Sequence, residues 1–240
     1  MIKLAISGCQ GRMGQRITAL SLQDKIFKIS ALLEDKNRPH VVSSSMNLPI
    51  CFEDEALEGS QVLIEFTTPE ATLLHLKACQ KYGVNMVIGT TGLTQAQVAL
   101  IKKASSKIGI VFSSNMSIGV NLVFGLVAQA ARITGKGYAI HLSETHHVHK
   151  KDAPSGTART MAEIAETFSK HKVKGIASIR EGEVIGDHTI TFDSEVDLIS
   201  IHHHAKTRDI FAQGALVAAK FIAKKKKGLF NMQDVLGLNG

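Results

Sequence analysis

Short apolar segments alternate with longer amphipathic segments through the first half of the chain. The apolar segments are residues 3–7, 27–33, 62–66, 85–88 and 108–112. Between them, apolar side chains recur at helical spacing in residues 11–20, in the stretch that follows Pro69, and in residues 94–103. Strands that alternate with helices are typical of βαβ units, in which the strands form one parallel sheet. The pattern therefore predicts an α/β domain.

The second half of the chain has a different pattern. Residues 138–145 are typical of an extended segment, residues 155–168 of a helix, and residues 176–204 mainly of strands. Apolar helical spacing returns only in residues 214–223. We therefore expect a smaller α+β domain, residues 118–212, inserted into a first domain made of residues 1–117 and 213–240.

Composition changes this picture little. The chain has 240 residues, of which 44% are hydrophobic and 20% charged, as is ordinary for a globular protein. The longest apolar stretch, residues 118–133, contains Asn121, Gln129 and Arg132, so we expect no membrane span. We expect no signal peptide, because few residues precede the first glycine turn. The three cysteines are widely spaced, which favours reduced thiols and a cytoplasmic protein.

The net charge of +7 is spread along the chain, and its densest run is residues 224–227, four lysines. We interpret this run as the solvated end of a helix, where positive charge suits the helix dipole. Only 5% of residues are aromatic and tryptophan is absent, which argues against a protein that stacks nucleic-acid bases. A basic balance also suits an enzyme whose substrate and cofactor are both anionic.

A glycine-rich turn lies between the first strand and the first helix. Gly8, Gly11 and Gly14 have the spacing Gly-x-x-Gly-x-x-Gly, and an acidic residue, Glu34, ends the second strand about 20 residues later. Glycines at such a turn let the backbone approach a diphosphate at the helix N-terminus, while the carboxylate binds ribose hydroxyls. The alternative is a plain strand-to-helix turn. We favour a Rossmann-like dinucleotide-binding domain, because strand, turn and helix are all in place.

The cofactor that this turn binds stays open between NADH and NADPH. Glu34 favours NADH, since a carboxylate repels the 2′-phosphate of NADPH. Lys36 and Arg38 follow closely and are able to hold that phosphate, whereas Asp35 argues against it.

The most informative stretch runs from Glu144 to Ala158. His146 and Lys150 are four residues apart, which places them on one face of either a strand or a helical turn. An imidazole and an ammonium so placed can supply protons and electrostatic stabilisation to a reacting carbonyl or imine. Residues 155–157, Ser-Gly-Thr, then offer hydroxyls and backbone N–H groups at a helix start, which suits a carboxylate.

This stretch resembles the signature of the dihydrodipicolinate reductases, E-x-H-H-x-x-K-x-D-x-P-S-G-T-A. The resemblance covers nearly the whole chain, and its motifs occur in the same order. The further matching segments are residues 11–14, 65–70, 89–92, 113–121, 186–189, 211–212 and 228–230.

The resemblance implies a role for each matching site residue. His146 and Lys150 match the catalytic pair, with Lys150 as the proton donor or as a clamp on a substrate carboxylate. The cofactor-binding positions are Gly8, Cys9, Gln10, Gly11, Arg12, Met13, Glu34, Gly89, Thr90, Thr91, Ser113, Ser114, Asn115 and Met116. The positions that bind the cyclic dicarboxylate substrate are His147, Gly156 and Thr157.

The resemblance also implies the reaction and the assembly. Hydride would pass from NADH or NADPH to the ring of 4-hydroxy-tetrahydrodipicolinate, after or with loss of water, to give tetrahydrodipicolinate for lysine and diaminopimelate biosynthesis. The inserted domain would bind substrate and form a homotetramer. This chain departs from the family in two compact segments, residues 35–59 and the segment between Phe168 and Arg180. The second bears on the tetramer contacts, and neither touches the catalytic motif.

Three other interpretations compete. The histidines at 146, 147 and 149 and at 202–204 suggest a metal site, but no cysteine or carboxylate completes a ligand set of usual spacing, so we predict no metal. We expect His202–His204 to be polar strand residues near the anionic substrate pocket.

A different two-domain amino- or keto-acid dehydrogenase is the alternative enzyme, and a dinucleotide sensor is the alternative without catalysis. A sensor need not keep Lys150.

Overall fold

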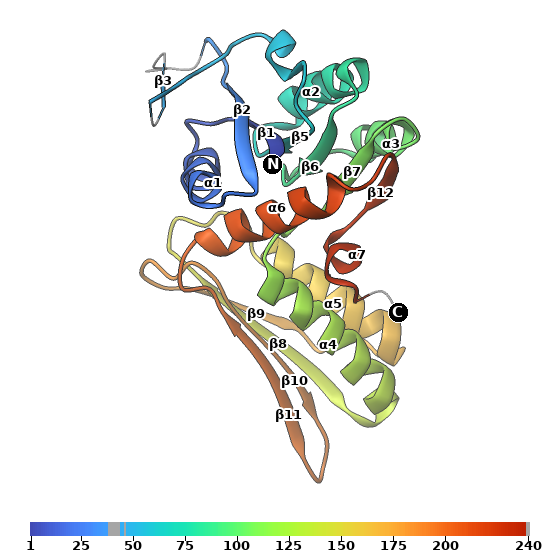
Figure 1. The fold of residues 1–240 in the computed structure, drawn as a ribbon. Coiled ribbons are helices and arrows are strands. Elements are labelled where there is room, and N and C mark those ends of the chain that lie inside the picture. Colours follow the sequence, from blue (N-terminus) through green and yellow to red (C-terminus); the bar gives the residue numbers. More distant parts are fainter. Residues whose placement is uncertain (38–43, 46, 239–240) are drawn as a thin grey trace. The chain divides into compact units, whose positions relative to one another are not determined.

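The computed structural model describes residues 1–37, 44–45 and 47–238, and divides the chain into two compact units (Figure 1). The first unit contains residues 1–117 and the C-terminal segment that begins at Phe211. The second unit contains residues 118–210. The second boundary lies two residues before the position that the sequence pattern gives.

A parallel six-stranded sheet forms the centre of the first unit, in the order β12-β7-β6-β5-β1-β2. Its strands are β1 (Ile2–Ser7), β2 (Phe27–Leu33), β5 (Val62–Glu65), β6 (Asn85–Ile88), β7 (Gly109–Phe112) and β12 (Gly228–Phe230). The strand order reverses between β1 and β5, which is where open α/β sheets bind ligands at the carboxyl ends of their strands. The sheet confirms the predicted Rossmann-like fold.

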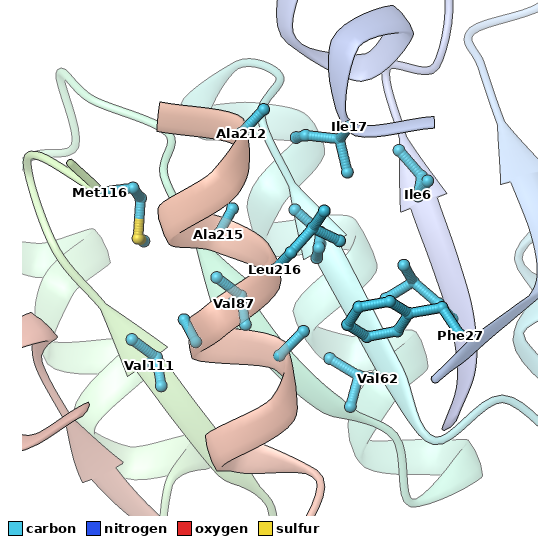
Figure 2. Packing of buried hydrophobic residues seen from close by; sticks show 14 of the residues in the cluster. Ile6, Ile17, Phe27, Val62, Val87, Val111, Met116, Ala212, Ala215 and Leu216 are labelled. Carbon is cyan, nitrogen blue, oxygen red and sulfur yellow. The ribbon is translucent and has the colours of Figure 1, made fainter. Parts of the chain in front are cut away.

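Helices cover both faces of this sheet. They are α1 (Arg12–Gln23), α2 (Pro69–Tyr82), α3 (Gln95–Ala104), α6 (Asp209–Ile222) and α7 (Met232–Leu236). Leu4 and Ile6 of β1 pack with α1 and α6, whereas Ala5 between them packs with α2 and α3. Figure 2 shows Ala212, Ala215 and Leu216 of α6 pointing toward the sheet. Burial on both faces explains why these strands are continuously apolar.

Three short elements complete the first unit between β2 and β5. They are β3 (Ser44–Ser45), β4 (Leu48–Pro49) and the 3₁₀ helix η1 (Asp54–Leu57). The strands β3 and β4 form a separate two-stranded sheet, and η1 packs against α2 and β2.

The second unit is a mixed four-stranded sheet with helices packed on one face. Its strands are β8 (Ala139–His146), β9 (Ile176–Arg180), β10 (Asp187–Asp193) and β11 (Leu198–His204), in the order β11-β10-β8-β9. Its helices are α4 (Ile118–Thr134), η2 (Gly135–Gly137) and α5 (Gly156–Ser169). Only β8 and β9 run parallel. This is the α+β arrangement that the second half of the sequence predicts.

The helix-facing side of this sheet is apolar at one end of its strands and polar at the other. Ile140 and Leu142 of β8, with Ile190 and Phe192 of β10, pack against α4 and α5. The same alternation then places polar side chains inward at the other end of the two strands, namely Glu144, His146 and His188. The sheet thus carries its own apolar core and a buried polar cluster side by side.

The apolar stretch that begins at Ile118 forms helix α4, which contributes to this apolar core. Val120, Val123, Phe124, Val127 and Ala131 of α4 are buried against the second unit's sheet and α5. Length and apolar composition alone would let the helical stretch Ile118–Gly137 cross a membrane. In the structure 33% of its apolar window is buried, and the buried side chains lie in the apolar core of the second unit.

Candidate active site

A buried carboxylate, Glu144, organises the polar end of the second unit's sheet. Arg180 lies in register with His146 on the neighbouring strand, and its guanidinium donates to both Glu144 oxygens, over 3.0 Å to Oε1 and 3.2 Å to Oε2. The backbone N–H of Ser155 donates to Oε1 over 3.2 Å. His146 Nδ1 makes a short hydrogen bond with Oε2. Arg180 also donates to the Asp152 carbonyl over 2.6 Å, which fixes the loop that follows β8.

The charges of this cluster settle the tautomer of His146. Burial raises the pKa of the Glu144 carboxyl, but hydrogen bonds from Arg180, Ser178 and His146 outweigh burial and hold that pKa below its ordinary value. Burial lowers the pKa of His146, and the charges of Lys150 and Arg180 lower it further against the pull of Glu144. At neutral pH a neutral His146 therefore donates its Nδ1 proton to an ionised Glu144. Nε2 is left as an acceptor that can take a proton or a hydrogen bond.

A second histidine packs beside the first. The rings of His146 and His188 meet edge to face with centroids 5.0 Å apart. His188 Nε2 lies 3.1 Å from the Ser155 hydroxyl, which also accepts from the Ala158 N–H and so caps α5. Burial, followed by the charge of His146, lowers the pKa of His188 to about 4. At physiological pH His188 is therefore a neutral polar side chain that packs against the cluster.

Lys150 lies in the loop after β8, beside the cluster. Its ammonium is 2.8 Å from Asp152 Oδ1, and 22% of its side chain is exposed. The strand ends at His146 and a turn follows, closed by the Lys150 N–H donating to the His147 carbonyl over 3.1 Å. The prediction that His146 and Lys150 share one face of a regular element is therefore wrong, although the charge of Lys150 does act on His146.

Three histidine nitrogens near this end of the sheet are buried without a hydrogen-bond partner in the described part of the chain. They are the Nδ1 atoms of His147, His188 and His203. His203 lies directly opposite His188 on the neighbouring strand. His202 and His204 instead contact Asp187, over 2.5 Å and 2.8 Å. Buried polar nitrogens of this kind are ready to meet a polar ligand, since leaving them unpaired costs free energy.

No three histidine, cysteine, aspartate or glutamate side chains gather as a possible metal site in the described ranges. Cys9, Cys51 and Cys79 are all free thiols.

The glycine turn of the first unit is tightly folded against itself. Gly8 has a φ of +61°, which favours glycine. A Cβ at Gly14 would lie 2.1 Å from the Gly8 carbonyl oxygen, so only glycine lets α1 begin this close to β1. Gly11 is the N-cap of α1 and provides no side-chain cap. This backbone cradle beside a helix N-terminus fits a diphosphate.

Glu34 lies next to that turn. Its Oε2 accepts from the Gln10 N–H over 2.9 Å, and its Oε1 from the Asp35 N–H over 3.2 Å. Lys36 lies 3.9 Å from Glu53 at the surface. Arg38, the other cation considered for a 2′-phosphate, lies outside the described residues.

The remaining predicted cofactor segments lie at the carboxyl ends of β6 and β7. A Cβ at Gly89 would lie 2.3 Å from the Phe66 ring, so the segment from Gly89 packs against the one that follows β5. Thr91 is exposed, whereas Thr90 is buried. In the segment after β7, the Ser113 hydroxyl donates to the Asn115 carbonyl over 2.9 Å.

Two predicted cofactor residues have core side chains. Cys9 and Met116 are buried in the apolar cluster of the first unit. Each therefore has only its backbone to offer a ligand. Sequence reasoning did not single out Glu144, Arg180 and His188 as site residues, although Glu144 lies inside the quoted signature. It expected Ser155 to bind a carboxylate of the substrate, whereas in the structure Ser155 bonds Glu144 and His188.

Comparison with known proteins follows the same division of the chain. The family model described as dihydrodipicolinate reductase, N-terminus, matches residues 2–116, and the model described as dihydrodipicolinate reductase, C-terminus, matches residues 119–236. A 4-hydroxy-tetrahydrodipicolinate reductase of Nitrosomonas eutropha is 41% identical over 265 aligned positions, which cover 99% of each chain. The corresponding protein of Nitrosomonas europaea is 39% identical, with 99% of this chain and 98% of that protein covered.

Solved structures agree with these matches. The dipicolinate-bound dihydrodipicolinate reductase from Paenisporosarcina sp. TG-14 superimposes with a TM-score of 0.84 at 25% identity, over 98% of each chain. A diaminopimelate dehydrogenase of C. glutamicum shares the fold more distantly, with a TM-score of 0.59 at 12% identity over 96% of this chain and 92% of that one.

Proposed function

The chain belongs to the dihydrodipicolinate reductase family, and from this premise we propose that it reduces 4-hydroxy-2,3,4,5-tetrahydrodipicolinate to tetrahydrodipicolinate with NADH or NADPH. The reaction is a step of lysine and diaminopimelate biosynthesis. The observation that carries the proposal is the buried Glu144–His146–Arg180 cluster with Lys150 beside it, in which Glu144, His146 and Lys150 belong to the family signature. No observation favours a different amino- or keto-acid dehydrogenase, because the likeness to one is a likeness of fold alone.

The first unit would hold the cofactor. The glycine turn, residues 8–13, would take its diphosphate, and Glu34 its adenosine ribose. The residues proposed for the nicotinamide side are Gly89, Thr90, Thr91, Ser113, Ser114, Asn115 and Met116. The cradle that a Cβ at Gly14 would fill supports this assignment. The bound cofactor supplies the hydride, and the turn keeps its place because Glu34 accepts from the Gln10 N–H.

The second unit would hold the cyclic dicarboxylate. His147, Gly156 and Thr157 would bind its carboxylates, with backbone N–H groups at the start of α5 and unpaired imidazole nitrogens as donors. Dipicolinate, the ligand bound to the Paenisporosarcina reductase, is also a cyclic dicarboxylate. Arg180 would act indirectly, because its guanidinium is already used by Glu144 and the Asp152 carbonyl.

His146 and Lys150 would handle the proton. The Lys150 ammonium can donate a proton as the ring is reduced, or neutralise a substrate carboxylate. His146 presents Nε2 as an acceptor and can orient a water, an ammonium or the substrate. Ionised Glu144 keeps that tautomer through the reaction, because Arg180 compensates its charge.

We further propose a cytoplasmic homotetramer. The free thiols of all three cysteines support a reducing compartment. The sheet face opposite α4 and α5 supports self-association, since it exposes Ile179 on β9 and Leu198 on β11, at 48% and 60% of their full accessible surface. Exposed apolar side chains on an open sheet are typical of protein interfaces.

Cofactor oxidation tests the function. Substrate is generated in situ from pyruvate and aspartate semialdehyde by the preceding synthase, and absorbance is followed at about 340 nm with NADH and then with NADPH. We expect oxidation that needs both the synthase and its substrates. The ratio of the two rates measures the preference that Glu34 and Lys36 leave open. A folded protein that binds either nucleotide but oxidises neither would contradict the proposal.

A further inference from the structure

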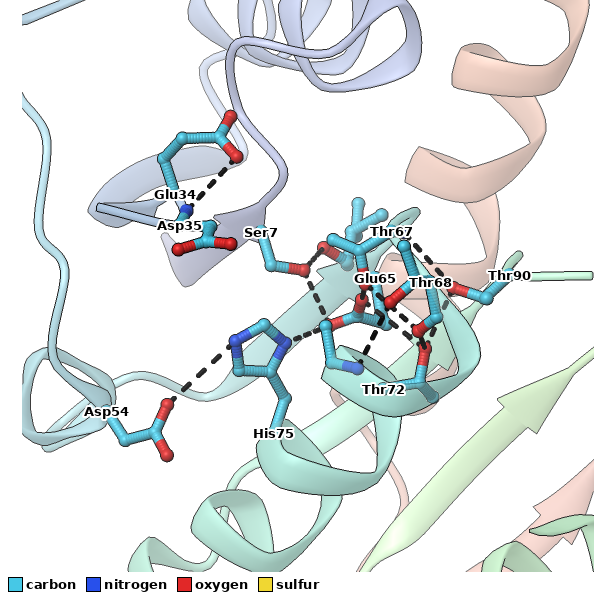
Figure 3. Close-up of polar contacts among 12 residues, drawn as sticks. Ser7, Glu34, Asp35, Asp54, Glu65, Thr67, Thr68, Thr72, His75 and Thr90 are labelled. Atoms are coloured by element: carbon cyan, nitrogen blue, oxygen red, sulfur yellow. Dashed lines mark hydrogen bonds and ion pairs between the residues drawn. The ribbon is translucent and has the colours of Figure 1, made fainter. Parts of the chain in front are cut away.

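A second buried carboxylate, Glu65, ends β5 in the first unit and plays no part in the site described above. It is fully buried, yet four neighbours satisfy it (Figure 3). The Ser7 hydroxyl donates to Oε2 over 2.6 Å, and His75 Nδ1 lies 2.6 Å from the same oxygen. The Thr67 hydroxyl makes a short bond to Oε1, and the Thr72 hydroxyl lies 3.5 Å from it. An ionised carboxylate withstands such burial only with partners of this kind.

The partners of Glu65 come from the end of β1, the segment after β5 and helix α2, and two of them bond Thr90 in turn. Ser7 is the last residue of β1, immediately before the glycine turn. Thr67 packs on that turn, because a Cβ at Gly8 would lie 2.9 Å from the Thr67 methyl carbon. The Thr67 N–H donates to the Thr90 hydroxyl over 3.2 Å, and that hydroxyl lies 2.9 Å from the hydroxyl of Thr72. The carboxylate therefore bonds the end of β1 and the segment after β5 directly, at the point where the strand order reverses, and is linked to the end of β6 through Thr67 and Thr72.

We propose that Glu65, paired with His75, is a positioning residue for the cofactor. It holds the glycine turn and the segments at Thr67 and Thr90 in the one arrangement that binds the diphosphate and the nicotinamide. The inference rests on the proposed cofactor site and adds to it a buried residue that does not touch the ligand.

The protonation state of His75 determines the net charge of the buried Glu65–His75 pair. His75 faces Glu65 on β5 and Asp54 of η1, the latter at 3.9 Å. Cys79 lies four residues further along α2 and is influenced by the same two carboxylates. Burial lowers the pKa of His75, but the hydrogen bond and charge of Glu65, with the charge of Asp54, outweigh burial and raise that pKa above its ordinary value. Burial and the same two carboxylates raise the pKa of the Cys79 thiol well above its ordinary value, so Cys79 stays neutral.

The protonation of His75 should affect the affinity of the turn for the cofactor. When His75 is protonated, it neutralises the carboxylate beneath the turn. When His75 loses its proton, an uncompensated negative charge remains under the anionic diphosphate and weakens binding. Cofactor affinity should therefore fall as pH rises through the pKa of His75, above 6.5.

The test is the dissociation constant of NADH without substrate, measured by calorimetry from pH 6.5 to pH 9. NADH is the probe because it lacks the 2′-phosphate, which has its own titration. In the wild type we expect the constant to rise roughly five- to tenfold across this range. His75→Gln should bind NADH at pH 6.5 as the wild type does at pH 9, and its constant should not change with pH. Glu65→Gln should bind roughly 10- to 100-fold more weakly than the wild type at pH 6.5, since misplacement by about 1 Å is enough for such a loss.

Two controls separate positioning from folding and from turnover. His171→Gln makes the same change in the other unit and should keep the wild-type pH profile. Circular dichroism and thermal unfolding show which variants are folded, and His75→Gln decides the matter if Glu65→Gln does not fold. The proposal is overturned if folded His75→Gln keeps the wild-type pH dependence, or if folded Glu65→Gln binds NADH as the wild type does. A wild type that binds NADH without oxidising it would contradict the proposed reaction and leave this inference standing.

Discussion

Lys150 and His146 differ in how the protein holds them, and this difference decides what each can do. His146 is locked, because its ring bonds a buried carboxylate that Arg180 also bonds. Among the residues that the structure describes, Lys150 forms its ion pair with the partly exposed Asp152. A proton donor has to reach its substrate, whereas a histidine that orients a ligand has to stay still. The ammonium at the edge of the cluster therefore suits proton transfer, and the fixed imidazole suits orientation.

Lys150→Ala tests this difference. We expect kcat/KM to fall by about 10²- to 10⁴-fold, as for loss of a general acid. Stability should change by no more than about 1 kcal/mol, because the ion pair with Asp152 is near the surface. A loss in kcat identifies the acid and a rise in KM the carboxylate clamp. Lys151→Ala, at the exposed neighbour, should keep wild-type kinetics. Equal losses in the two variants would refute the assignment.

His188 makes the protein sensitive to acid. Its pKa is about 4 in the folded state, against about 6.5 unfolded, so the unfolded chain binds more protons between these values. Stability from this group is complete above pH 6.5 and is lost as pH falls to about 4. We expect His188 to account for roughly 2 kcal/mol of the stability lost between pH 7 and pH 5 in urea unfolding.

His188→Gln should lose that share of the pH dependence, although it is less stable at pH 7. His141→Gln, an exposed histidine on the same sheet, should behave as the wild type. An unchanged slope in His188→Gln would show that other histidines carry the acid sensitivity.

At the scale of elements, periodicity predicted nearly all of the strands and helices that carry the site. The parallel strands of the first unit are buried on both faces and so are continuously apolar, and the amphipathic helices between them are easily recognised. In the stretch that begins at Ile118, the sequence pattern indicates an apolar segment but does not predict a helix. Its buried and exposed positions are both apolar, with Leu122 and Leu126 on the exposed side, so hydropathy alone shows no polar face.

The junction of β1 and α1 is the element-scale feature with the sharpest steric requirement. In Gly14→Ala the new methyl group would lie 2.1 Å from the Gly8 carbonyl oxygen, which is backbone and cannot rotate away. We expect a loss of about 1–3 kcal/mol in unfolding free energy and at least tenfold weaker NADH binding. Gly137→Ala, where a Cβ meets nothing within 4 Å, is the control. Normal NADH binding by Gly14→Ala would mean that the turn does not hold the diphosphate.

At the scale of the whole molecule, the sequence signature predicts where the site lies but does not reveal the distant residues that hold its side chains in place. Glu144, His146 and Lys150 are close in sequence, so one motif reveals them. Arg180 is 36 residues from Glu144, and His188 is 33 residues from Ser155. Only the pairing of β8 with β9 and β10 brings these side chains together. No local pattern distinguishes Arg180 from any other surface arginine.

The proposed assembly is a prediction at the same scale. Light scattering should give a mass near four times that of the 25.9 kDa chain. Ile179→Glu together with Leu198→Glu should reduce that mass, because charge on an apolar interface opposes association. Leu74→Glu, an equally exposed leucine of the first unit at 59%, should leave it unchanged. A monomeric wild type would refute the tetramer.

The most direct test of the central claim is the fate of the hydride. NADH carrying deuterium at both C4 positions is supplied with freshly generated 4-hydroxy-tetrahydrodipicolinate, and the product is analysed by mass spectrometry. The account predicts tetrahydrodipicolinate about one mass unit heavier than the product made with ordinary NADH, and formed at a much lower rate by Lys150→Ala. Unlabelled product, or consumption of the labelled nucleotide without any tetrahydrodipicolinate, would contradict it.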